Sequence, residues 1–298
     1  MRFTRRRFVL GAGAAVGLSS TGISFGQTNP IRLGLMTVKT GPLASGGIDM
    51  ERALVMYLRE RNGALAGRKI ELFVGDSGGV PAQARTKIQE LVEREHIQVM
   101  IGPLATAEAL AADDYIRQQQ LLTLSVAAAE DMTQRKPNPW FTRGTSTSSQ
   151  CAQPLADYCY NQLKMRRMAV IADDIPYGHE MCAGFQRVLE DLGGRIVQKT
   201  FPPLTVPDYG TYLAQLKTNI DGIFLGFAGS NGFRYLRQFN EYGLRGKVTP
   251  VGGSAGTRPS STIRSTANSP PSSARNSSTI PASTPPPPMS RPPCSRRR

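Results

Sequence analysis

The sequence predicts an α/β protein with two doubly wound lobes, parallel sheets and a cleft between the lobes. The first observation is a regular alternation of short apolar runs with amphipathic stretches, beginning at residue 31. The second is the segment 136–145, where two prolines interrupt this alternation before it starts again. Because parallel strands need long crossover connections, repeated strand–helix units imply parallel sheets that are covered by helices.

Apolar runs predict the strands of the first lobe, at 31–38, 69–75, 99–101 and 121–125. Between them, helical spacing of apolar residues predicts helices at 47–62, 81–95 and 106–119. In the second of these helices, Ile88, Leu91 and Val92 recur at the spacing of one helix face. These units predict one α/β lobe that ends before the interruption.

The same alternation predicts a second lobe after residue 145. Its expected helices lie at 149–163, 180–192, 209–218 and 233–242. Its expected strands lie at 168–173, 195–201, 222–225 and 248–252. Ligands of open parallel sheets bind beyond the carboxyl ends of the strands, where helix N-termini favour anions. Two such lobes therefore predict a ligand site in the cleft.

The net charge is concentrated at the two ends of the chain. The 298 residues include 36 Lys and Arg against 22 Asp and Glu, a formal net charge of +14. Arginines within the first seven residues and after residue 257 supply most of this excess. The remainder is close to neutral, so the composition gives no support to a nucleic-acid partner.

Residues 1–26 predict an export signal. An arginine-rich start is followed by a short apolar run at 11–18 and then by small residues. The run is too short to span a bilayer permanently. Arg5, Arg6 and Arg7 with the hydrophobic residues that follow resemble a twin-arginine signal, and a Sec signal is the alternative. Either route predicts a periplasmic or otherwise extracytoplasmic protein.

Residues 257–298 predict a disordered tail rich in Ser, Pro and Arg. The segment has no acidic and no aromatic residue, so it cannot bury enough apolar surface to fold. Two explanations stay open: a native linker, or a frameshift that truncates the second lobe. The predicted organisation is therefore a signal, lobes at 27–143 and 144–256, and this tail.

Several segments resemble one protein family: 40–43 (TGPL), 67–72 (GRKIEL), 81–84 (PAQA), 101–103 (IGP) and 174–178 (DIPYG). Together with the predicted lobes they are similar to the type I periplasmic solute-binding proteins, and most of all to the leucine/isoleucine/valine-binding proteins of ABC importers. Segments 138–143 (NPWFTR) and 201–204 (FPPL) resemble the branch associated with aromatic compounds. The resemblance implies capture of a small solute by lobe closure and delivery to membrane permease subunits. It implies no cofactor, no metal and no catalysis.

The resemblance also implies a set of ligand-binding residues: Ala105, Thr106, Ala127, Ala128, Ala129, Tyr177, Phe227, Ala228, Ser230 and Ser254. Thr106 has an alternative role as a helix N-cap, and Tyr177 has one as a turn residue. The loop 252–255 has no acidic residue that could pair with the ammonium of an amino acid. The expected ligand is therefore a carboxylate without an α-amino group, and an aromatic acid is favoured over leucine.

The hypothesis that the protein is an enzyme has little support in the sequence. His179-Glu180 begins a zincin-like motif, but Ala183 stands where the second histidine is needed. Trp140 is expected to pack in the core or hinge, and Cys151, Cys159 and Cys182 are expected to be buried thiols, with Cys294 in the tail. Besides a solute-binding protein, two hypotheses remain: a truncated non-functional product and an exported α/β enzyme.

Overall fold

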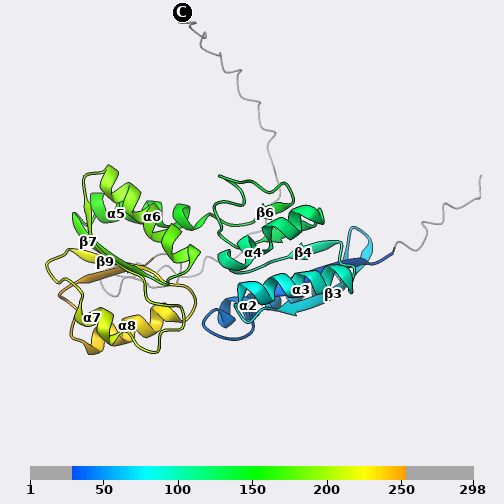
Figure 1. The fold of residues 1–298 in the computed structure, drawn as a ribbon, viewed down its shortest axis with the longest axis horizontal. Helices are drawn as coiled ribbons and strands as arrows, with labels where there is room; N and C mark the ends of the chain where they lie inside the picture. The colour runs from blue at the N-terminus through cyan, green and yellow to red at the C-terminus, as the bar shows by residue number, and fades with distance from the viewer. Residues whose placement is uncertain (1–28, 253–298) are drawn as a thin grey trace, which may run out of the picture. The chain divides into compact units, whose positions relative to one another are not determined.

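The computed structural model describes residues 29–252, which form two sheets covered by helices (Figure 1). The predicted α/β class with two doubly wound lobes is confirmed for these residues. The predicted export signal and the Ser/Pro/Arg-rich tail lie outside the described residues. We call the six-stranded sheet with its helices the first lobe and the four-stranded sheet with its helices the second lobe.

The first lobe has the strand order β2-β3-β1-β4-β5-β6. Its strands are β1 (Ile31–Thr37), β2 (Ala64–Leu65), β3 (Arg68–Asp76), β4 (Val99–Ile101), β5 (Leu122–Ser125) and β6 (Phe141–Arg143). Its helices are α2 (Ala44–Arg59), α3 (Pro81–Glu93) and α4 (Thr106–Gln118). Every pairing is parallel except that of β2 with β3. The order reverses between β1 and β4, which creates a switch point at the carboxyl ends of these strands.

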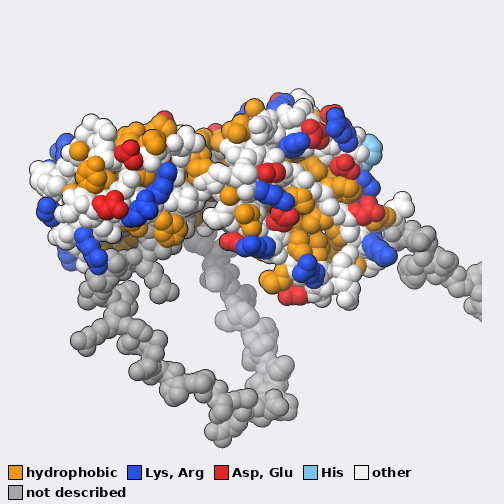
Figure 2. Space-filling view, turned by 90° about the horizontal axis from the view of Figure 1, so that it is seen from below, with side chains coloured by type: hydrophobic (Ala, Val, Ile, Leu, Met, Phe, Trp, Pro, Cys, Tyr) orange, Lys and Arg blue, Asp and Glu red, His pale blue; other side chains and the backbone are white. Residues whose placement is uncertain are grey.

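Helices α3 and α4 bury one face of this sheet. Ile88 from α3 and Ile116 from α4 pack with Met36 and Met100 from the strands. On the other face, α2 is held to β1 by the Thr37 hydroxyl, which donates to the Gly47 carbonyl at 2.8 Å. The outer face of β5 is more open, since Leu122 and Leu124 are each 43% exposed. Hydrophobic side chains are visible among the charged ones in the space-filling view (Figure 2).

The second lobe has the strand order β10-β9-β7-β8, and all of its pairings are parallel. Its strands are β7 (Arg167–Ala172), β8 (Arg195–Thr200), β9 (Gly222–Gly226) and β10 (Thr249–Gly252). Its helices are α5 (Ser148–Asn161), α6 (Pro176–Asp191), α7 (Gly210–Ala214) and α8 (Asn231–Glu241). The switch point of this sheet lies between β7 and β9.

Alternating side chains of β7 and β9 supply two separate cores. Ile171 and Ile223 pack with residues of α7 and α8, whereas Val170 and Phe224 pack with residues of α5 and α6. Figure 1 shows α5 and α6 on one side of the sheet and α7 and α8 on the other. Strands covered on both faces read as continuous apolar runs, which is why they were recognisable in the sequence.

Three local predictions were wrong or incomplete. Strand β6 lies within the proline-containing segment that was expected only to interrupt the fold. Helix α6 begins at Pro176, four residues earlier than expected, because proline fits the first helical position. Cys151 is exposed, since it lies off the buried stripe of α5, while Cys159 and Cys182 are buried as expected. The expected packing role of Trp140 is confirmed by its contact with the first-lobe core.

Candidate ligand-binding pocket

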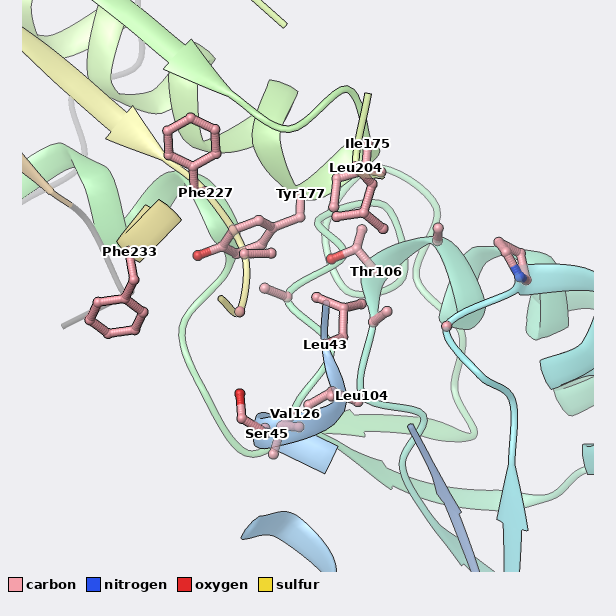
Figure 3. Close-up of a pocket in the computed structure, with 18 residues that line it drawn as sticks. Leu43, Ser45, Leu104, Thr106, Val126, Ile175, Tyr177, Leu204, Phe227 and Phe233 are labelled. Atoms are coloured by element: carbon pink, nitrogen blue, oxygen red, sulfur yellow. The ribbon is translucent and has the colours of Figure 1, made fainter. Parts of the chain in front are cut away.

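A cavity of about 660 Å³ is lined by both lobes (Figure 3). The first lobe contributes Leu43, Ser45, Gly46, Gly79, Pro81, Leu104, Ala105, Thr106, Ala107, Val126 and Ala128. The second lobe contributes Ile175, Tyr177, Leu204, Phe227, Ala228, Gly229 and Phe233. This volume is within the usual range for small-molecule sites.

Every lining residue follows the carboxyl end of a strand, in a loop or in the first turns of the next helix. Helices α2, α3, α4, α6 and α8 all begin beside the cavity. The first amides of a helix have no intrahelical acceptors, and the helix dipole adds partial positive charge there. The topology therefore surrounds the cavity with groups that favour an anion.

The side chains that line the cavity are mostly apolar. None of the eighteen carries a formal charge, and side-chain polar groups come from Ser45, Thr106 and Tyr177. Phe233 is 61% exposed although it lies in the first turn of α8 beside the cavity. An exposed aromatic ring at a pocket wall is typical of a surface that receives an apolar ligand.

Thr106 is the first residue of α4, and its hydroxyl has no hydrogen-bond partner in the structure. The side chain is buried, with only 3% exposed, and Oγ1 is unpaired. The alternative role as N-cap is excluded because Ala105 occupies the N-cap position. Figure 3 shows the Thr106 hydroxyl oxygen on the side facing Tyr177. Buried hydroxyls are normally paired, so this unpaired hydroxyl distinguishes Thr106 from the other residues that line the cavity.

The N-terminus of α4 is held by a buried acid that the sequence analysis did not identify. Glu108 is fully buried, accepts the Ala105 N–H through Oε2 at 3.2 Å, and is hydrogen-bonded to the Ser77 hydroxyl. Burial raises the pKa of Glu108 above its ordinary value. A glutamate three residues after the N-cap is one half of a capping box, which is a detectable sequence signal. Since the Ala105 amide is bonded to Glu108, Ala105 contributes to the cavity wall rather than as a backbone donor.

The loop after β5 presents alternate residues to the cavity. Val126 and Ala128 line it, whereas Ala127 and Ala129 are fully buried in a cluster with Met132. Burial therefore alternates along this loop, from the cavity to the core and back. Of the three alanines predicted here, the structure therefore brings only Ala128 to the pocket.

In the second lobe, Tyr177, Phe227 and Ala228 line the cavity as the sequence analysis expected. Phe227 lies against the rings of Tyr209 and Tyr235, with ring centroids 5.5 and 5.1 Å away. These contacts fix the orientation of Phe227 at the pocket wall. Ser254 lies outside the described residues.

Ser230 has a different position from the one predicted. It is exposed, forms the N-cap residue of α8, and donates its backbone N–H to the Pro42 carbonyl of the first lobe at 3.1 Å. Next to it, Gly229 has φ +57°, and a Cβ at this position would lie 2.1 Å from the same carbonyl oxygen. Glycine is therefore required where the two lobes meet beside the cavity.

Several lining residues were missed in the sequence analysis: Leu43, Leu104, Ile175, Leu204 and Phe233. The prediction took only the positions that matched the ligand-binding loops of the family it resembles. The signal that was available is position, since Leu43, Leu104, Ile175 and Leu204 each follow a predicted strand by a few residues and Phe233 begins a predicted helix. Apolar residues exposed in such loops are candidates for ligand contacts.

Two doubly wound lobes with one shared cavity at the carboxyl ends of their strands define a two-lobed ligand-binding protein. The chain belongs to the periplasmic binding protein family, whose sequence profile matches residues 30–268. It is similar to Leu/Ile/Val-binding protein homolog 6 of Brucella abortus (strain 2308), with 23% identity over 234 residues. That match covers 78% of this chain and 60% of the relative.

Two solved structures are similar over 75% of this chain. One is an ABC transporter substrate-binding protein from Sphaerobacter thermophilus, with 31% identity, a TM-score of 0.68 and 62% of its length covered. The other is a solute-binding protein of an ABC transporter from Rhodopseudomonas palustris BisB5 in complex with 3,4-dihydroxybenzoic acid. It has 26% identity, a TM-score of 0.70 and 61% of its length covered. The chain thus spans about 60% of the length of these proteins.

Within residues 29–252, no cluster of three His, Cys, Asp or Glu side chains is arranged to hold a metal ion. None of the helices in the same range has the length and apolar character needed to cross a membrane.

Proposed function

We propose that the protein is the extracytoplasmic substrate-binding component of an ABC importer and that it captures a small carboxylate. We further propose an aromatic acid as the ligand rather than a branched-chain amino acid. The observation that carries the proposal is the unpaired, buried Thr106 hydroxyl at the start of α4 in an otherwise apolar cavity.

A carboxylate would satisfy this part of the pocket. Its oxygens can accept a hydrogen bond from the Thr106 hydroxyl and from the first amides of α4, which have no intrahelical acceptors. Hydrogen bonds to a charged acceptor are about twice as strong as neutral ones. Since none of the described lining side chains is cationic, backbone and hydroxyl donors supply the recognition.

The apolar lining favours an aromatic body without an ammonium group. Among residues 29–252, no acidic side chain lines the cavity, so an α-ammonium would find no ionic partner in this part of the chain. Leu104, Val126 and Phe233 offer apolar surface to a ring. The similar protein from Rhodopseudomonas palustris BisB5, bound to 3,4-dihydroxybenzoic acid, supports this ligand class.

Capture by lobe closure is supported by the backbone bond from Ser230 to Pro42 beside the cavity. This bond requires the two loops to approach each other, so it forms only when the lobes are close. Export through the predicted twin-arginine or Sec signal would bring the protein to the periplasm. There we expect the closed form to deliver its ligand to membrane permease subunits.

Isothermal titration calorimetry of the full chain at pH 7.4 tests this function. The panel is benzoate, 4-hydroxybenzoate, 3,4-dihydroxybenzoate and L-leucine, with benzamide as the uncharged match of benzoate. We expect saturable binding of at least one aromatic acid and binding of benzamide at least ten times weaker than that of benzoate. Tighter binding of leucine than of every aromatic acid would overturn the ligand class, and binding of no carboxylate would overturn the function.

A further inference from the structure

A fully buried carboxylate lies behind the second-lobe wall of the pocket. Asp173 directly follows β7 and does not itself line the cavity. Its Oδ2 accepts the backbone N–H of Ala228 at 2.7 Å, and its Oδ1 accepts from Nδ2 of Asn231 at 2.6 Å. Burying an ionised carboxylate is unfavourable unless its oxygens are hydrogen-bonded, and here each oxygen has a donor.

Asn231 extends this connection to a third loop. Its Nδ2 also donates to the Leu204 carbonyl at 2.8 Å, and its Oδ1 accepts from Nη2 of Arg234 at 3.0 Å. The Asp173–Asn231 pair therefore joins the loops that follow β7, β8 and β9. Each of these loops contributes residues to the cavity: Ile175 and Tyr177 after β7, Leu204 after β8, and Phe227, Ala228 and Gly229 after β9.

We infer that Asp173 is a positioning residue for ligand binding, because its carboxylate holds the three loops of the second-lobe wall in the arrangement that receives the ligand. The part of this inference that concerns affinity rests on the proposed function. The part that concerns the loops does not, since the hydrogen bonds are present in the chain alone.

Only the ionised carboxylate can accept both bonds without conflict. Protonation places an O–H on one oxygen, where it faces the N–H of Ala228 or of Asn231, so one of the two bonds weakens. Burial raises the pKa of Asp173 from 3.8 to about 6, against the opposing effect of its hydrogen bonds and of Arg234. The loops are therefore expected to loosen as the pH falls from 7.5 to 5.5.

The other groups around Asp173 do not explain such a change. On α8, the Arg234 guanidinium attracts the ionised form. Before α7, burial raises the pKa of Tyr209 to about 12, far above this pH range. On α6, His179 bonds the adjacent Asp174 at 2.7 Å rather than Asp173. The variant Asp174→Asn is therefore a matched control, because it removes an exposed carboxylate one residue away whose bond to His179 stays within the β7–α6 segment and does not reach the loops after β8 and β9.

Hydrogen exchange and benzoate titration of the full chain test the inference. In Asp173→Asn we expect exchange at the Ala228 amide to become at least tenfold faster at pH 7.5, with no change in Asp174→Asn.

We expect benzoate affinity to fall about tenfold in Asp173→Asn, which corresponds to the loss of one hydrogen bond to a charged group. Wild-type affinity should also fall toward pH 5.5, where benzoate stays ionised, and Asp173→Asn should show no such step. Asn231→Ala, which removes the shared donor, should also accelerate exchange at this amide.

The outcomes separate the inference from the proposed function. If the wild type binds no carboxylate but Ala228 exchange accelerates in Asp173→Asn, the loop-holding role stands and the proposed function fails. If the wild type binds benzoate and Asp173→Asn matches it in affinity, pH profile and exchange, the inference is wrong and the function stands. Equal effects in Asp174→Asn would also overturn the inference.

Discussion

Replacing Thr106 by valine is expected to strengthen the unligated protein while weakening ligand binding. Valine keeps the β-branched shape and replaces the hydroxyl by a methyl group. In the unligated structure that hydroxyl is buried and unpaired, so it contributes an unsatisfied polar group and no hydrogen bond. The proposed carboxylate removes this deficit only when it is bound.

The magnitudes follow from these two states. A buried unpaired polar group costs about 1–3 kcal/mol, so Thr106→Val is expected to raise the free energy of unfolding by about 1 kcal/mol after some relaxation. A hydrogen bond to a charged group contributes about 1.5–3 kcal/mol, so its loss lowers benzoate affinity by roughly 10- to 150-fold. The two effects have opposite signs, which general damage to the fold does not produce.

Urea unfolding without ligand and calorimetric titration with benzoate measure the two effects. Thr106→Ser, which keeps the hydroxyl, is the matched control, and its benzoate affinity should stay within about threefold of wild type. If Thr106→Val destabilises the unligated protein and leaves benzoate affinity unchanged, the hydroxyl has a structural partner and the proposed role is wrong.

Three further predictions concern closure, titration and thiol access. Gly229→Ala should weaken benzoate binding at least tenfold, because its Cβ would lie 2.1 Å from the Pro42 carbonyl oxygen. Circular dichroism should show little change in secondary structure, and unchanged benzoate affinity would show that this contact is not part of the bound form. The folded-state pKa of Asp173 is raised from 3.8 to about 6, so protonation relieves a buried charge and stabilises the whole fold, although it weakens one hydrogen bond of the pocket wall. This global stabilisation is complete below pH 4 and is lost as the pH rises through 6. Relative to Asp173→Asn, the wild type should therefore gain up to about 3 kcal/mol in urea unfolding between pH 7 and pH 4, and parallel pH profiles of the two proteins would contradict this. Iodoacetamide at pH 8 should modify Cys151 in the native protein and spare Cys159 and Cys182, because burial raises the pKa of each of these two thiols to about 12. Equal labelling of the three cysteines, measured by mass spectrometry, would contradict this burial.

The sequence predicted most of the fold because local signals and tertiary packing agree. Strands such as β7 and β9 are apolar throughout, since helices cover both of their faces. Strand β6 was missed because it has three residues and follows two prolines, so its pairing with β5 is decided by tertiary contacts. The short strand β2 escaped notice for the same reason, since two residues carry no period.

The loops of the pocket were predicted more completely than its individual lining side chains. The loops after β4, β5, β7 and β9 were all identified, and Thr106, Tyr177 and Phe227 line the cavity. In the loop after β5, tertiary packing decides which alanine lines the cavity, and three identical residues give no sequence signal for it. The Asp173–Asn231 pair joins residues 58 positions apart, and such a pairing depends on how β7 and α8 come together.

The residues that line the pocket all lie in segments that follow strand ends, and this affects how ligand preference can change between related proteins. The buried side chains of β7 and β9 pack beneath the cavity and do not line it. Substitutions at lining positions such as Leu43, Val126 or Phe233 can therefore alter what is recognised without disturbing the sheets. One scaffold can in this way acquire new specificities through a few exchanges at its rim, while its folding requirements stay the same.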